Sequence, residues 1–166
     1  MWLKYFIVVV IFYFFALLQN SFFIHFNFLG ATPNLVFIFF TVLLFFSALS
    51  WENFFYAATG GLFLDFFSHT YFGISIIFLL AVGFLFKKIQ SLLKENRGDS
   101  FPLVYFLPLF FMSFIAYDLL LRSAGFRIGL LAEMAYNLLF AVIIFYIYKR
   151  FFQLKTDNRQ LKLFSG

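Results

Sequence analysis

The chain has 166 residues, of which 64% are hydrophobic and 11% are charged, whereas soluble domains average roughly 45–50% apolar and about 25% charged residues. A soluble fold of this length cannot withdraw so much apolar surface from water, so the composition excludes an ordinary soluble protein and indicates an integral membrane protein. The formal net charge is +5, but the basic residues lie in short segments between apolar runs, which argues against nucleic-acid binding.

Six apolar segments are predicted to be membrane-spanning helices, because a helix needs roughly 20 residues to cross about 30 Å of hydrocarbon. In chain order they cover residues 5–23, 34–50, 54–68, 71–86, 101–121 and 132–148. We therefore predict an all-α integral membrane protein with one six-helix domain, residues 1–150, and a basic tail, residues 151–166. The third and fourth segments are short, so a re-entrant hairpin is the alternative there. No small-x-small cleavage site follows the first segment, which favours a retained anchor over a signal peptide.

The polar segments between the helices carry the topology signals. Trp51-Glu52-Asn53 is predicted to be a tight turn, and residues 87–100 form the longest polar stretch. In that stretch Ile89, Leu92 and Leu93 have the spacing of a short helix lying in the membrane interface. Plain positive-inside anchoring and a docking surface for a cytoplasmic partner are the other interpretations of these basic segments.

The distribution of Lys and Arg predicts that both termini are cytoplasmic. In this orientation only Arg122 and Arg127 lie in loops on the outer side of the membrane, and every other basic residue is on the inner side. Cytoplasmic termini at both ends require an even number of membrane crossings.

Polar side chains inside a bilayer are costly and mark candidate functional positions. With both termini inside, they fall near the outer ends of the helices, whereas the cytoplasmic half is expected to be almost purely apolar. We call this set the outer polar layer: Asn20, Asn34, Asp65, Asp118, Arg122, Glu133 and Asn137. Asp118 and Arg122 are spaced to pair on one helix face, as a neutralised pair or a ligand clamp. Arg127 is a possible partner for Glu133.

The third segment has the sharpest pattern. Ala57, Gly61 and Asp65 recur every four residues on one helix face, with Gly60 beside them. Small residues at this spacing let two helix backbones approach closely in lipid. Asp65 would then enter a buried polar layer; the alternative is that it caps the helix near the headgroups.

The sequence contains no nucleophile–base set, phosphate-binding loop or HExxH-type motif. It has no cysteine, and its two histidines, His25 and His69, are far apart. Disulfides and thiolate metal sites are excluded on this basis. We expect no enzymatic activity, no cofactor and no metal.

Two of these segments together resemble a known family. The run Ala31-Thr32-Pro33-Asn34-Leu35 begins the second helix, and Gly60-Gly61-Leu62-Phe63-Leu64-Asp65 ends the third, with Gly73 eight residues later. This arrangement is similar to the rod shape-determining MreD family over roughly residues 30–75. The second helix begins with Pro-Asn here, whereas Pro-Asp is common in the family, which weakens an acidic role at position 34.

The resemblance implies a non-enzymatic inner-membrane component of the bacterial cell-wall elongation complex. Such a protein binds MreC and works alongside MreB, RodA and a class B penicillin-binding protein. The residues expected to form the helix-packing seam or the partner interface are Pro33, Asn34, Ala57, Gly60, Gly61, Asp65 and Gly73.

The family's bundle is similar to the substrate-binding subunits of vitamin-uptake transporters, so such a subunit is the alternative function. The outer polar layer motivates it. The first segment counts against it, because these subunits usually carry an Ala-xxx-Ala docking face and here Ala16 is the single small apolar residue.

Overall fold

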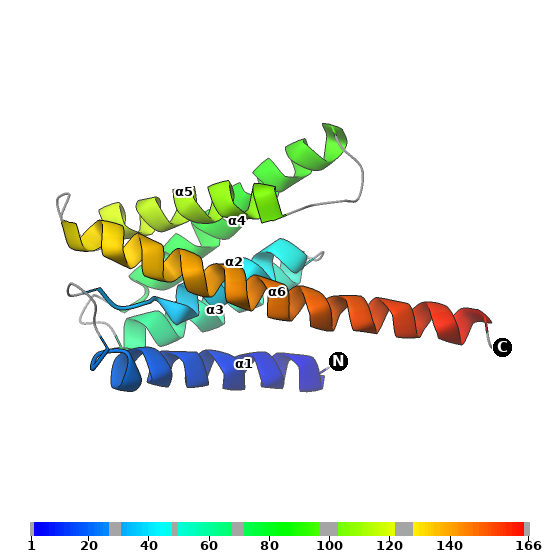
Figure 1. Ribbon diagram of the computed structural model, residues 1–166, viewed down its shortest axis with the longest axis horizontal. Coiled ribbons are helices and arrows are strands. Elements are labelled where there is room, and N and C mark those ends of the chain that lie inside the picture. Colours follow the sequence, from blue (N-terminus) through cyan, green and yellow to red (C-terminus); the bar gives the residue numbers. More distant parts are fainter. Residues whose placement is uncertain are drawn as a thin grey trace.

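The computed structural model describes residues 2–26, 31–47, 50–67, 72–96, 103–121 and 128–164. Helices dominate these ranges (Figure 1), which confirms the predicted all-α class. The elements are α1 (Trp2–Leu17), its π-helical continuation η1 (Leu18–Phe22), α2 (Leu35–Phe46), α3 (Ser50–Phe67), α4 (Ile74–Asn96), α5 (Leu103–Leu121) and α6 (Ile128–Phe164).

Consecutive helices run in opposite directions, so that the N- and C-termini lie at the same end of the bundle (Figure 1). We call this the terminal end; it also holds the C-terminus of α2 and the N-terminus of α3. The opposite end holds the N-terminus of α2, the C-terminus of α3 and the N-terminus of α4. Because the helices alternate, the described members of the outer polar layer expected from the sequence fall at the opposite end.

Within the described residues, three helices are long and apolar enough to cross a membrane: Trp2–Phe22, Ile74–Leu92 and Leu131–Arg150. Leu35–Phe46 and Phe106–Asp118 are apolar but shorter. Large hydrophobic side chains such as Phe6, Phe66 and Phe84 are exposed on the outside of the bundle. A lipid environment would cover such a surface, whereas a soluble monomer rarely exposes large apolar patches.

The helix bounds correct several predictions. The predicted tight turn at residues 51–53 is wrong, because these residues form the first turn of α3. The predicted loop from residue 87 is largely wrong, since α4 continues to Asn96 and leaves no separate interfacial helix there. Likewise α6 runs without a break into the basic tail as far as Phe164. A helix can continue beyond its apolar segment, because polar residues such as Lys, Glu and Gln also favour the helical conformation in water.

The third and fourth segments form two antiparallel helices (Figure 1). α3 has 18 residues and α4 has 23, which correspond to lengths of about 27 Å and 35 Å. The short element is instead α2, with 12 residues and a length of about 18 Å. The predicted second span, residues 34–50, therefore ends early: Ser47 already has an extended backbone.

Helix α2 forms the centre of the bundle. Every residue from Leu35 to Phe45 is buried. The ring of Phe37 packs against Phe110, Phe114 and Tyr117 of α5, with centroid distances of 5.1–6.0 Å. At the other end of α2, the ring of Phe45 meets aromatic rings of α4, α5 and α6: Phe86, Phe106 and Phe145. The abundant phenylalanine thus fills the core as well as the outer surface.

The C-terminus of α2 ends inside the bundle, where its last carbonyl groups lack helical partners. Other groups supply them. The Leu43 and Leu44 carbonyls accept from the backbone N–H and the hydroxyl of Ser47, at 2.9 and 3.2 Å. The Phe45 carbonyl accepts from Gln90 Nε2 of α4 at 3.0 Å. Lys87 Nζ, also of α4, donates to the Ser47 carbonyl and to Gln90 Oε1.

These contacts predict that Lys87 is structural, beyond any effect of its charge on topology. Lys87→Met should destabilise the purified protein, because a buried polar group left without its partner costs about 1–3 kcal/mol. Lys88→Met is the matched control, since it removes the same charge from an exposed neighbour. Thermal unfolding in detergent measures the difference; equal losses in both variants would contradict the assignment.

Candidate functional site

The small residues of α3 lie against two neighbouring helices. A Cβ atom placed on Gly61 would be 2.5 Å from the Cα and 2.7 Å from the backbone N of Ile76 in α4. A Cβ on Gly60 would be 3.1 Å from the Phe12 ring of α1. Ala57, on the same face as Gly61, is buried. We call these residues, with Asp65, the α3–α4 seam; at Gly61 the two backbones are too close for any side chain.

Asp65 is buried and holds the start of α4. Its Oδ2 accepts from the backbone N–H of Gly73 at 2.7 Å, and its Oδ1 accepts from that of Ser75 at 3.0 Å. The Gly73 carbonyl accepts the Ile77 N–H, so Gly73 stands at the N-cap position of α4. The carboxylate of the preceding helix therefore does the work of an N-cap side chain, and its negative charge suits a helix N-terminus.

Gly73 completes this arrangement. Its φ of +99° lies in the left-handed region that glycine adopts readily. That conformation turns the chain so that the N–H groups of Gly73 and Ser75 both reach Asp65. Of the two sequence interpretations of Asp65, burial in the protein is the one observed, and the residue caps the following helix rather than its own.

At the N-terminus of α2, two asparagines join distant parts of the chain. Asn34 follows the buried Pro33 and is the N-cap: its Oδ1 accepts from the Phe37 N–H at 3.1 Å. The Asn34 N–H in turn donates to Asn137 Oδ1 of α6 at 2.7 Å. Asn137 Nδ2 donates to the Glu133 carbonyl at 2.8 Å. Both asparagines are buried, and Asn34 Nδ2 has no hydrogen-bond partner in the part of the chain described.

The remaining members of the outer polar layer are not all brought together. Asn20 is exposed and donates to the Ala16 carbonyl of its own helix at 2.8 Å, so it stands apart from the buried pairs. Asp118 is buried on α5 and Glu133 is half-buried on α6. Arg122 and Arg127 lie outside the described residues, and so do the ion pairs predicted for them.

The terminal end contains a second polar group that the sequence interpretation missed. Lys4 of α1 and Glu52 of α3 form an ion pair at 2.5 Å. The Ser47 hydroxyl is bonded to Asn53, and Lys87 and Gln90 lie next to them at the end of α2. The expectation that this half is almost purely apolar is therefore wrong. The sequence did contain a signal for this polar group, namely the side chains of Glu52, Asn53 and Gln90. These residues lie in segments that were interpreted as loops.

Several of these polar groups bind backbone or side-chain groups of another helix or of its flanking residues, and so tie helices together. Among the residues that the structure describes, no three His, Cys, Asp or Glu side chains are grouped to hold a metal ion. No family model matches this chain, and neither a curated protein nor a solved structure matches it. Functional inference therefore depends on the residues and their geometry.

The seam predicts different outcomes for two glycines. Gly61→Ala should destabilise the protein by about 1–3 kcal/mol, because its new methyl group meets the backbone of Ile76 and overpacks the contact. In Gly83→Ala the new Cβ lies 3.8 Å from its nearest neighbours, which is ordinary contact. That control should match or slightly exceed the wild type, because alanine favours helix more than glycine does. Thermal unfolding in detergent compares them; an undisturbed Gly61→Ala protein would refute the close approach.

The stability of the first turn of α4 should depend on the number of acceptor atoms that the side chain at position 65 carries. Asp65→Ala leaves the buried Ser75 N–H unpaired, at a cost of about 1–3 kcal/mol, and also removes the acceptor of the partly buried Gly73 N–H. Asp65→Asn keeps one acceptor and should lose less. Hydrogen exchange of the first turn of α4 reports the cap directly: protection should fall in the order wild type, Asn, Ala. Unchanged exchange in the alanine variant would show that Asp65 does not cap α4.

Proposed function

We propose that this chain is a non-enzymatic, multi-pass component of the bacterial cell-wall elongation complex, of the MreD type. In this proposal it crosses the inner membrane six times with both termini in the cytoplasm. The observation that carries the proposal is the contact between Asp65 and Gly73. Two of the residues on which the family resemblance rests, Asp65 and Gly73, are joined in one capping interaction, so both have a physical reason to be where they are.

The state of the polar groups supports a scaffold. Asp65, Asn34 and Asn137 bind backbone groups of this chain, which fixes the helices relative to one another. A rigid bundle with an apolar exterior is suited to presenting a constant surface to other membrane proteins. MreC is the proposed direct partner; MreB, RodA and a class B penicillin-binding protein would be reached directly or through it.

The partner surface needs to lie outside the α3–α4 seam. Gly60, Gly61 and Asp65 are buried against this chain's own helices. On the other side of α3, Leu62 and Phe66 are 43% and 73% exposed near the opposite end of the bundle. We therefore place the proposed MreC contact on this outer face of α3, with the seam holding that face in position.

Co-purification tests the association. The chain should copurify from detergent with the MreC-like protein of the same bacterium, and its depletion should convert rods to rounded cells. Wild type and Gly83→Ala should restore shape, whereas Gly61→Ala should restore it poorly. A well-expressed pair that never associates would refute the proposal.

The absence of cysteine makes the contact surface directly testable. Cysteines placed at Leu62 and Phe66 should crosslink to MreC. Phe84→Cys on α4 is the matched control, because Phe84 is as exposed as Phe66. Equal crosslinking from all three positions would indicate random collision and would refute the assignment of the MreC contact to the outer face of α3.

One observation favours a second function, a substrate-binding subunit of a small-molecule uptake transporter. Asn34 Nδ2 is a buried donor without a partner in the described structure, and it lies at the end of the bundle assigned to the outer side. A bound ligand would satisfy it. Thermal stabilisation by one member of a vitamin panel, lost in Asn34→Ala, would support this function; a flat panel would refute it.

A further inference from the structure

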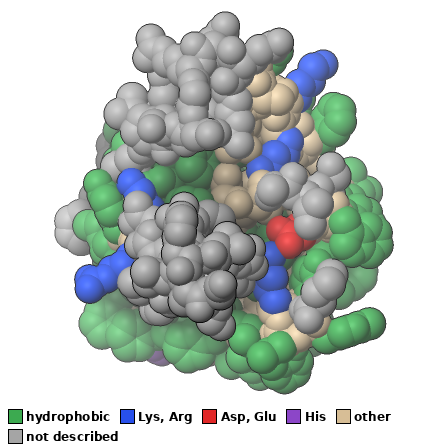
Figure 2. All heavy atoms as spheres, turned by 90° about the vertical axis from the view of Figure 1, so that its right-hand side faces the viewer, with side chains coloured by type: hydrophobic (Ala, Val, Ile, Leu, Met, Phe, Trp, Pro, Cys, Tyr) green, Lys and Arg blue, Asp and Glu red, His purple; other side chains and the backbone are tan. Residues whose placement is uncertain are grey.

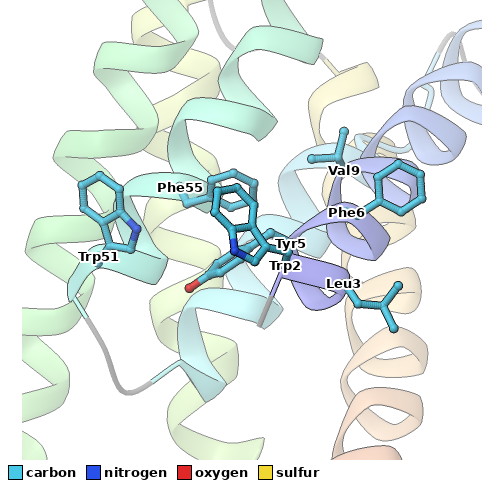
Figure 3. A pocket seen from close by; sticks show the side chains of 7 residues that line it. All are labelled: Trp2, Leu3, Tyr5, Phe6, Val9, Trp51 and Phe55. Atoms are coloured by element: carbon cyan, nitrogen blue, oxygen red, sulfur yellow. The ribbon is translucent and has the colours of Figure 1, made fainter.

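An apolar groove lies between α1 and α3 at the terminal end (Figure 3). Trp51 and Phe55 of α3 contribute to its wall; the other lining residues come from α1 and are Trp2, Leu3, Tyr5, Phe6 and Val9. Its volume is about 860 Å³, within the roughly 300–1,000 Å³ of ligand-binding clefts. The rings of Tyr5 and Phe55 meet edge to face with centroids 4.9 Å apart, so the two helices touch beneath it.

The lining distinguishes between possible apolar occupants. Transmembrane helices pack on one another through small residues that allow close approach. The groove offers none: its lining is five aromatic rings, one leucine and one valine. A flexible hydrocarbon chain can follow such a surface, whereas a helix of about 10 Å diameter meets protruding rings. The side chains thus favour a lipid chain over a partner helix.

A cation stands beside the groove. Lys4 follows Leu3 and precedes Tyr5, and its ammonium group is 2.5 Å from Glu52 Oε1 of α3. The Lys4 side chain remains 45% exposed, and an ammonium group has three N–H donors, of which Glu52 takes one. Other basic side chains lie across the same end of the molecule among hydrophobic ones (Figure 2). Tryptophan is enriched at the depth of the lipid headgroups, and the groove carries two tryptophans, Trp2 and Trp51.

We propose that this groove binds an anionic phospholipid of the leaflet facing the termini. One acyl chain lies between α1 and α3, and the phosphate accepts from Lys4. The site goes beyond the proposed function and shares with it only the premise that the chain is inserted in a membrane.

The chain supplies its own probe for the test. Trp2 and Trp51 are its two tryptophans, and both line the groove. The full chain is placed in nanodiscs of unlabelled phosphatidylcholine with a minor fraction of brominated phosphatidylglycerol or brominated phosphatidylcholine. Brominated phosphatidylglycerol should quench about fivefold more effectively per lipid, the preference expected for one lysine near anionic lipid. Unlabelled phosphatidylglycerol should reverse the quenching.

Two other results would overturn the proposal. Equal quenching by both lipids would show an unselective lipid surface. No quenching by either would show that a protein segment occupies the groove and shields both tryptophans.

Three variants separate the headgroup contact from the shape of the groove. Lys4→Gln should abolish the headgroup preference, whereas Lys88→Gln, the same charge loss on α4, should keep it. Glu52→Gln frees Lys4 and should keep or increase the preference. If Lys4→Gln and Glu52→Gln both abolish it, the ion pair only holds the groove open, and the proposed phosphate contact is wrong.

Carbonate extraction of native membranes separates this proposal from the proposed function. Release of the chain by carbonate would refute membrane insertion and therefore both proposals. If the chain is retained and both lipids quench equally, only the lipid-site proposal is refuted. The elongation-complex proposal is then tested by the association and cell-shape experiments.

Discussion

A helix end that lies inside a low-dielectric interior has backbone groups with no water to satisfy them, and α2 has two such ends. Its 12 residues are too few for both ends to reach the headgroup regions of a bilayer. The N-terminal end is met by Asn34 and by Asn137 of α6, and the C-terminal end by Lys87 and Gln90 of α4. The positions of α4 and α6 around α2 are thus linked to the hydrogen bonds that the two ends of α2 require.

The same solution recurs where α3 meets α4. Asp65 supplies the acceptors that glycine at the N-cap position of α4 cannot, while Gly61 lets the two backbones touch. These are one unit, because the close approach at Gly61 brings the start of α4 within reach of the carboxylate one turn further along. Polar residues that mark function in many membrane proteins serve here as joints between helices, which is why a scaffold is favoured over a pocket.

Local patterns predicted a large part of this arrangement. Apolar runs located the helices, Pro33-Asn34 marked the start of α2, and the spacing of Ala57, Gly61 and Asp65 identified the face that packs. The sequence did not reveal the partners of Lys87 and Gln90, because these contacts join residues 40 and 45 positions apart and a basic residue beside an apolar run looks like a topology signal. The end of α2 was also missed, since its composition does not distinguish a 12-residue helix from a longer apolar one.

The enclosure of α2 has a consequence for how the protein is made. The groups that complete its ends lie later in the chain, and Asn137 follows Asn34 by 103 residues. During synthesis α2 therefore leaves the ribosome well before Lys87, Gln90 and Asn137 exist. An insertion machinery has to shelter this segment, or let it wait at the membrane surface, until α4 and then α6 arrive. We therefore expect a fragment that stops before α6 to leave the Asn34 N–H at the start of α2 without its partner on Asn137.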